Sequence, residues 1–129
     1  MIKFLLVLYF GADEVENHLL EDKEREAIKD CFIEKLVEMP VIPRIGEYIN
    51  LGGNNFQVDD VLHVITKGLV EVECNTELFC GVAAYAEDKE GWNLDNLLSD
   101  GKELFFKRVE QFEKRKAQRE ADKCATAQQ

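Results

Sequence analysis

The sequence predicts an α+β fold, with a mostly antiparallel, strongly bent sheet or a small, partly open barrel. The chain opens with the apolar run IKFLLVLYF at residues 2–10, continues through alternating segments around a Gly/Asn turn, and ends in an amphipathic helix. Continuous apolar runs of this length are typical of strands covered on both faces, and period-two alternation indicates half-buried strands. We expect a single α+β domain over residues 1–123, starting with an N-terminal strand, and a polar tail over 124–129.

An acidic insert, GADEVENHLLEDKEREAIKD, follows at residues 11–30. Asp13 can cap a helix there, but the stretch EDKERE interrupts its apolar positions. The insert is therefore predicted to be either a mostly solvated helix or a long acidic loop. Residues 31–38 fit a helical stripe or a strand, and we favour a strand because Pro40 biases Met39 towards extended geometry.

A β-hairpin is predicted next. GEYINL at residues 46–51 and FQVDDVLHVIT at 56–66 flank GGNN, whose residue types accept positive φ. Alternation in the second segment slips by one place at Asp59 and Asp60, which predicts a bulge or tight bend. His63 falls on the predicted inward face, and we favour a buried, hydrogen-bonded histidine over a metal ligand.

A further strand and a loop are predicted after the hairpin. LVEVEC at residues 69–74 alternates apolar residues with Glu71 and Glu73 and predicts a half-buried strand. The small, apolar segment LFCGVAAYA at 78–86 is predicted to be its antiparallel partner. The polar stretch 87–101 then predicts a loop region.

The C-terminal segment predicts an amphipathic helix. Phe105, Val109 and Phe112 recur at i, i+4 and i+7. Asp100 followed by Glu103 resembles a capping box, with Asp in place of the usual Ser or Thr. No large apolar residue follows Phe112, so we expect only the first turns to pack and the basic end to project into solvent or onto a partner.

The stretch IPRIGEYINLGGNNFQVDDVLHVI, roughly residues 42–65, resembles small uncharacterised bacterial and phage proteins. These carry Pro-Arg-Ile/Val-Gly-Glu/Asp, a hydrophobic strand, a Gly/Asn turn and a strand of the form aromatic-x-Val-x-x-Val. The resemblance implies a small β-barrel-like hairpin and carries no activity with it.

Charge is distributed unevenly along the chain. Residues 1–100 hold 8 Lys and Arg against 21 Asp and Glu, a net charge of −13, whereas residues 101–129 hold 8 against 5, a net charge of +3. An acidic body repels phosphate backbones, which argues against nucleic-acid binding through it. The same field attracts basic protein surfaces, although acidity also serves solubility alone.

Catalytic and metal-binding signatures are absent from the sequence. The cysteines, Cys31, Cys74, Cys80 and Cys124, form no CxxC pair, and we expect mainly free, buried thiols, with Cys124 exposed. The only serine, Ser99, has no nearby histidine, and the glycines of LGGN lack the lysine of a phosphate-binding loop. We therefore expect no enzyme activity, no metal and no cofactor.

The leading hypothesis is a non-enzymatic, cytoplasmic, acidic protein-binding module. It would be an inhibitor encoded by a phage or mobile element that binds the basic surface of a nucleic-acid-binding protein, as a nucleic-acid mimic. Arg44 is either a contact for a partner carboxylate or an internal partner of Glu47 or Asp60, and Trp92 is either a contact anchor or a cover for one edge of the core. The predicted partner-binding residues are Glu14, Glu16, Glu21, Asp22, Glu24, Glu26, Arg44, Glu87, Asp88 and Trp92.

Two alternatives remain open. A nucleic-acid-binding small barrel would place the basic C-terminal helix, including Lys114, Arg115 and Lys116, on phosphates. A small-ligand-binding barrel would enclose His63. The first apolar run is too short to span a bilayer, so no membrane partner is expected. Unpaired strand edges and a Phe-rich helix make a homodimer a further possibility.

Overall fold

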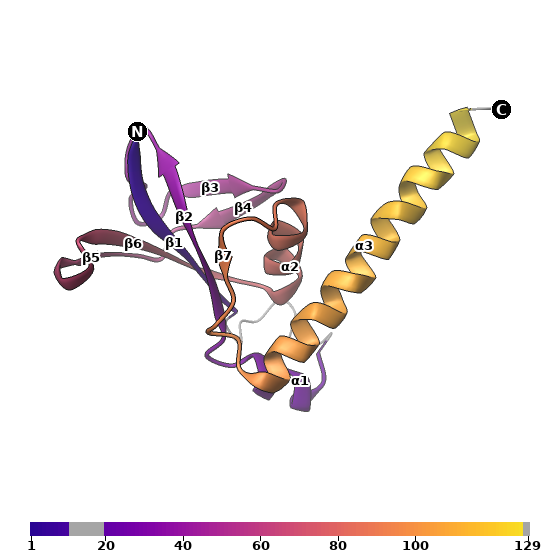
Figure 1. Cartoon of the computed structure of the whole chain (residues 1–129), viewed down its shortest axis with the longest axis horizontal. Helices are drawn as coiled ribbons and strands as arrows, with labels where there is room; N and C mark the ends of the chain where they lie inside the picture. The colour runs from indigo at the N-terminus through magenta and orange to yellow at the C-terminus, as the bar shows by residue number, and fades with distance from the viewer. Residues whose placement is uncertain (11–19, 128–129) are drawn as a thin grey trace.

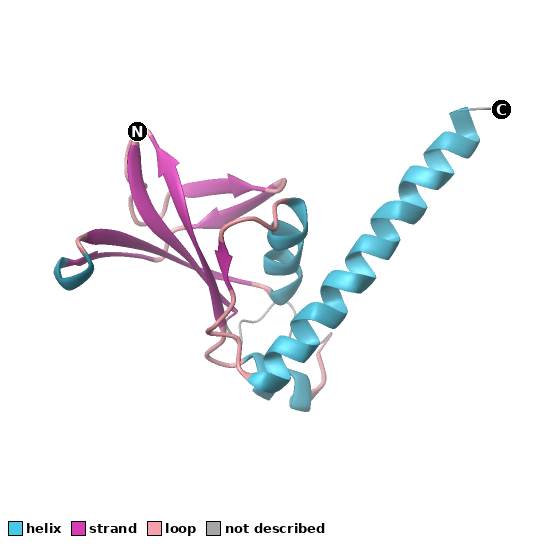
Figure 2. Cartoon of the chain, in the orientation of Figure 1, coloured by secondary structure: helices cyan, strands magenta, loops and turns pink. Residues whose placement is uncertain are grey.

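The computed structural model describes residues 1–10 and 20–127, with side chains to Cys124 (Figure 1). Strands dominate the first half of the described chain, and a long helix ends it (Figure 2). The elements are β1 (Ile2–Phe10), α1 (Asp22–Ile28), β2 (Phe32–Met39), β3 (Tyr48–Leu51), β4 (Asn54–Gln57), β5 (Asp60–Val64), the 3-10 helix η1 (Ile65–Lys67), β6 (Leu69–Thr76), α2 (Leu78–Glu87), β7 (Trp92–Asn93) and α3 (Ser99–Ala127).

Five strands form one mixed sheet in the order β5-β6-β1-β2-β7, and β3 and β4 form a separate hairpin. β1 pairs parallel with β6, whereas β2 pairs antiparallel with β1 and β7, and β5 antiparallel with β6. The predicted α+β class with a mostly antiparallel sheet is therefore confirmed. No closed barrel is found among the strands that the structure describes.

The core lies on one face of the sheet. Alternate residues of β1, namely Phe4, Leu6, Leu8 and Phe10, are at most 1 % exposed. The β3–β4 hairpin, α2 and the first turns of α3 contribute the facing apolar side chains, and they lie on one side of β1 and β2 in Figure 1. Phe105 of α3 stacks on Phe10 with ring centroids 5.8 Å apart.

Two glycines allow the helices to approach this core closely. A Cβ on Gly81 of α2 would lie 2.1 Å from Cε1 of Phe10. A Cβ on Gly101 of α3 would lie 2.5 Å from the carbonyl oxygen of Ala27 and 2.8 Å from Sγ of Cys31. Real Cβ atoms do not tolerate such distances, so glycine permits this packing at both positions.

The prediction of a strand over residues 78–86 is wrong, because this segment is helix α2. Its buried residues, Leu78, Gly81, Val82 and Ala84, follow helical spacing. Both edges of β6 are already paired, one with β5 and the other with β1. A short apolar run cannot be assigned to helix or strand by periodicity alone, and the pairing of β6 decides the outcome here.

The single bent strand predicted over residues 56–66 is also wrong. The chain forms β4 up to Gln57 and a new strand, β5, from Asp60, and these strands belong to different sheets. The hairpin itself is confirmed, with its turn at Gly52 and Gly53, which have φ of 60° and 80°. The slip in alternation at the two aspartates therefore marks a change of sheet.

The predicted burial of His63 is wrong as well, although its predicted face is confirmed, because His63 lies opposite Val70 on the core side of the sheet. His63 is exposed because β5 is an edge strand that extends beyond the helices, so no enclosed ligand site forms around it.

Within the acidic insert, residues 20–30 contain only the short helix α1, and the proposed cap Asp13 lies outside the described residues. The strand predicted at 31–38 is confirmed as β2.

The amphipathic C-terminal helix is confirmed as α3. It begins at Ser99, so Asp100 lies within its first turn and does not cap it as predicted. It continues to Ala127, through much of the stretch predicted as a tail, and from Glu113 to Cys124 every side chain is exposed. None of the helices in the described ranges combines the length and apolar character needed to cross a membrane.

Candidate functional site

The second face of the sheet points away from the described helices and from the β3–β4 hairpin. The register places Val7 of β1 opposite Glu34 of β2 and Glu73 of β6, and Glu73 opposite Asp60 of β5. Opposed residues in paired strands share a face, so these four form a row across the sheet. The residues of this surface, here called the outer face, are Leu5, Val7, Tyr9, Phe32, Glu34, Leu36, Asp60, Leu62, Glu71 and Glu73.

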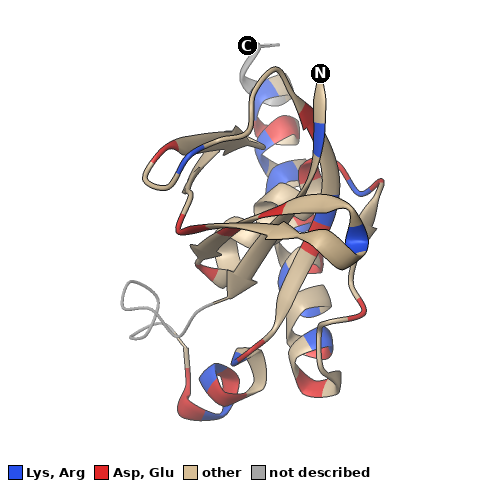
Figure 3. Cartoon of the chain, turned by 90° about the vertical axis from the view of Figure 1, so that its left-hand side faces the viewer, with Lys and Arg blue, Asp and Glu red and all other residues tan. Residues whose placement is uncertain are grey.

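Six of the ten residues of the outer face have apolar or aromatic side chains. None of its residues is part of the core cluster, although Val7 is only 2 % exposed. Leu36 and Leu62 are 51 % and 39 % exposed, and the rings of Tyr9 and Phe32 pack with centroids 4.8 Å apart. Figure 3 views the molecule from this side, with the sheet in front of α3. The described helices therefore leave apolar surface uncovered here.

Most carboxylates of the outer face have no Lys or Arg partner among the described residues. Among the described residues, only Glu71 has a cation, Lys67, whose Nζ lies 3.2 Å from Oε1 of Glu71. Glu34, Asp60 and Glu73 form no ion pair within the described residues. Their hydrogen bonds come from neutral donors, such as the Asn93 amide, which lies 2.8 Å from Glu34 Oε1.

The pKa values on the outer face respond to this charge. Burial raises the pKa of Glu73, and the neighbouring carboxylates of Asp60 and Glu71 raise it further. Burial also raises the pKa of Tyr9, as do Glu73, Glu71 and Glu34. A raised carboxyl pKa means that the ionised form is disfavoured. An incoming cation would relieve this repulsion.

A cavity of about 340 Å³ lies at one end of the outer face, lined by Tyr9, Asp59, Asp60, Glu73 and Asn75. The backbone N–H of Asn75 donates to Oδ2 of Asp59 at 2.7 Å, which fixes this carboxylate at the rim. The two consecutive aspartates therefore face the same cavity. In a regular strand they would point to opposite faces, but the change of sheet before β5 brings them together.

The acidic residues predicted on α1 serve mainly intramolecular roles. Glu21 caps α1 in a reciprocal capping box with Glu24. Asp22 pairs with Arg25, and Glu24 pairs with Arg108 of α3 at 3.2 Å. Glu26 is exposed. Glu14 and Glu16 lie outside the described residues.

Arg44 lies on the exposed loop between β2 and β3. Its backbone N–H donates to Oε1 of Glu47 at 2.6 Å, while its guanidinium forms no ion pair with any described residue. The internal pairing with Glu47 therefore involves the main chain and leaves the guanidinium accessible. The structure does not bring Arg44 onto the outer face.

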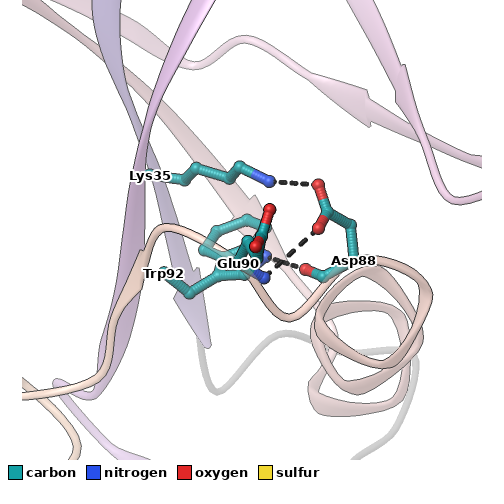
Figure 4. A network of polar contacts seen from close by, with 4 residues as sticks. All are labelled: Lys35, Asp88, Glu90 and Trp92. Carbon is teal, nitrogen blue, oxygen red and sulfur yellow. Dashed lines mark hydrogen bonds and ion pairs between the residues drawn. The ribbon is translucent and has the colours of Figure 1, made fainter.

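Asp88 and Trp92 form a network with Lys35 of β2 (Figure 4). Nζ of Lys35 lies 2.5 Å from Oδ2 of Asp88 and 5.6 Å from the centre of the Trp92 ring, and Nε1 of Trp92 donates to the Asp88 carbonyl at 2.7 Å. The hydrogen bond from Lys35 lowers the pKa of Asp88, with help from the backbone N–H of Glu90. Trp92 is half-buried against the core, and Glu87 lies 3.7 Å from Lys116. These predicted contacts are thus engaged within the chain.

No group of three or more His, Cys, Asp or Glu side chains within the described part of the chain is arranged to hold a metal ion. Cys31 and Cys74 are buried free thiols, and Cys124 is exposed. Burial raises the pKa of Cys74 to about 12, which keeps it protonated at neutral pH. This thiol is therefore not a nucleophile.

Sequence reasoning missed the outer face because its residues come from four strands far apart in the sequence. The signal was present in part, since Glu71 and Glu73 alternate with apolar residues and had to point away from the core. What sequence could not show is that Glu34 and Asp60 lie beside them. Comparison of the chain with protein-family models, curated proteins and solved structures finds no match.

Proposed function

We propose that the protein is a non-enzymatic binding module whose outer face engages a basic surface of a partner protein. The observation that carries this proposal is a row of carboxylates, Glu34, Glu73 and Asp60, that have no cation among the described residues and lie beside exposed or half-buried apolar side chains. Lys and Arg side chains of a partner would pair with the carboxylates, and their aliphatic stems would cover Leu36 and Leu62.

The charge of the chain supports the same partner class. The net charge is −10, so a basic partner is attracted over a distance before contact is made. Surfaces that normally hold nucleic acid are basic and would suit this face, which is the chemistry of an inhibitor encoded by a phage or mobile element. The acids of α1 and the end of α2 contribute less, because Asp22, Glu24 and Asp88 are paired within the chain.

The experiment is capture of proteins from a lysate of the source cells on the immobilised chain, followed by mass spectrometry. Captured proteins should be basic, and their binding should fall steeply between about 0.05 M and about 0.5 M NaCl, because salt screens exposed charges. The test variant is Glu34→Gln/Asp60→Asn/Glu73→Gln, which removes three negative charges from the outer face and should abolish capture.

The matched control is Glu90→Gln/Glu103→Gln/Glu120→Gln, which removes the same charge at exposed positions off the outer face. It should retain most of the capture. Equal loss in both variants would mean that net charge alone is responsible, and this would refute the assignment to the outer face. Capture that survives high salt would refute the electrostatic mechanism.

A further inference from the structure

A groove lies between α2 and α3, on the side of the sheet opposite the outer face. Its cavity volume is about 550 Å³. Phe79 and Ala83 of α2 and Phe112 of α3 line it and are half-buried, so they offer apolar contact area. We call it the helix groove. It forms because α3 leaves the body of the protein after Phe112 (Figure 1).

The helix groove is basic in an acidic protein. Four cations line it, all from α3: Arg108, Arg115, Lys116 and Arg119. Glu87 is the only acid among the lining side chains, and it lies 3.7 Å from Lys116. With a rise of 1.5 Å per residue, the cations from Arg108 to Arg119 extend over about 16 Å. The groove therefore presents a row of positive charge beside an apolar floor.

The cations of this row differ in how they are held. Arg108 bonds to Glu24 at 3.2 Å and to Gln111 at 3.3 Å, and its guanidinium lies 5.3 Å from the centre of the Phe79 ring. The Arg108 guanidinium therefore packs over the Phe79 ring, and both side chains line the groove. Arg115 and Arg119, in contrast, are exposed and form no ion pair with any residue that the structure describes.

We propose that the helix groove binds an acidic, amphipathic segment of a partner protein. Its apolar side chains would contact Phe79 and Phe112, and its carboxylates would accept hydrogen bonds from the guanidinium groups of Arg115 and Arg119. Guanidinium groups match carboxylates in a bidentate geometry, which favours such a segment over an uncharged one. This site uses none of the outer-face residues and does not depend on the function proposed for them.

The charge distribution favours an acidic peptide over nucleic acid. The positive row is short, and the whole chain has a net charge of −10. A nucleic acid carries charge along its entire length and would meet the acidic body on leaving the groove. A peptide can limit its negative charge to the length of the groove.

The test is fluorescence anisotropy with the full chain and three labelled probes. The first is a helical peptide of about 16 residues, which at 1.5 Å per residue spans about 24 Å and so covers the whole positive row. It carries Glu on one face and Leu and Phe on the other. The second is a scrambled peptide of identical composition, and the third is single-stranded DNA of similar length. The amphipathic peptide should bind most tightly, since only it aligns charge and apolar groups with the groove.

The test variant is Arg115→Gln/Arg119→Gln, and its matched control is Lys114→Gln/Lys123→Gln. Both remove two positive charges from exposed positions of α3, but only the first pair concerns the groove. The groove variant should weaken peptide binding roughly ten-fold or more, and the control less than about two-fold. The outer-face variant Glu34→Gln/Asp60→Asn/Glu73→Gln should not weaken it, which keeps the two proposals distinguishable.

Four results would overturn the proposal. These are no binding of the amphipathic peptide, equal binding of the scrambled peptide, tighter binding of the DNA, or equal loss in the groove variant and its control. Sedimentation of the chain without peptide provides the last check. Self-association that the groove variant abolishes would also overturn the proposal, because it would assign the groove to a second copy of the chain.

Discussion

The two faces of the five-stranded sheet carry similar apolar side chains from β1. They differ in the elements that pack against those side chains. On the core face, Phe4, Leu6 and Leu8 are buried under the hairpin and the helices. On the outer face, Leu5 and Tyr9 remain half-buried with no described helix above them. The same strand therefore contributes to the core through one face, and the other is the face that we propose for binding.

The acids near the two faces differ in the same way. Beside the helices and β7, Glu24, Glu87 and Asp88 each have a cation within the chain. On the outer face, Glu34 and Glu73 have none among the described residues. This difference teaches that net charge alone does not locate a binding site. Our proposal therefore rests on the acids that have no cation among the described residues and lie beside exposed apolar side chains.

Removal of a core-face contact should have the largest effect. Phe105 is fully buried and packs against the rings of Phe10 and Tyr85, so Phe105→Ala should lower the free energy of unfolding by about 3–5 kcal/mol. The control is Leu36→Ala on the outer face, which should change it by less than about 0.5 kcal/mol because Leu36 is 51 % exposed. Urea unfolding measures both. Equal losses would show that the outer face is structural.

Overpacking of the core face should have the next largest effect. Gly81→Ala adds a methyl group where Phe10 lies, and it should lower the free energy of unfolding by about 1–3 kcal/mol. Phe10→Leu removes the ring atoms that clash, so the double variant should lose less than the sum of the single variants. A strictly additive double-mutant cycle by urea unfolding would contradict this packing.

Breaking a paired acid should have a smaller, pH-dependent effect. Asp88→Asn removes the partner of Lys35, whose side chain is only 15 % exposed, and should lower the melting temperature at pH 7. The folded state lowers the pKa of Asp88, so its stabilisation is present above the unfolded pKa of about 3.9 and is lost as pH falls through the folded value. Thermal melts from pH 7 to pH 3 should therefore show the two proteins converging. The matched control, Asp95→Asn, alters an exposed acid for which no ion pair exists in the described structure.

Neutralising an unpaired acid should have the smallest effect and the opposite sign. Glu73→Gln should raise the free energy of unfolding at pH 7 by at most about 0.5 kcal/mol, because the ionised carboxylate is destabilised by burial and by its neighbours. The folded state raises the pKa of Glu73, so protonation removes this penalty as pH falls through the folded value towards the unfolded value of about 4.3. The advantage of the variant should therefore disappear at low pH. A less stable variant at pH 7 would contradict the repulsion on the outer face.

Several elements could be predicted from local residue patterns because their signals do not depend on distant partners. Gly52 and Gly53 produce the turn of the hairpin, and the spacing of Phe105, Val109 and Phe112 produces the packed part of α3. Helix α2 could not be assigned, because LFCGVAAYA suits a buried helix and a buried strand equally. Only the pairing of both edges of β6 excludes the strand.

The sequence by itself determined the α+β class, the β1 and β2 strands, the hairpin, the amphipathic helix and the acidic charge, because propensity, periodicity and composition are local properties. Only the tertiary structure decided which acids are paired and which face of the sheet is covered. Glu24 meets Arg108 across 84 positions of the sequence, and Asp88 meets Lys35 across 53. Such contacts depend on how elements pack, so a count of charges could not separate them from the unpaired carboxylates of the outer face.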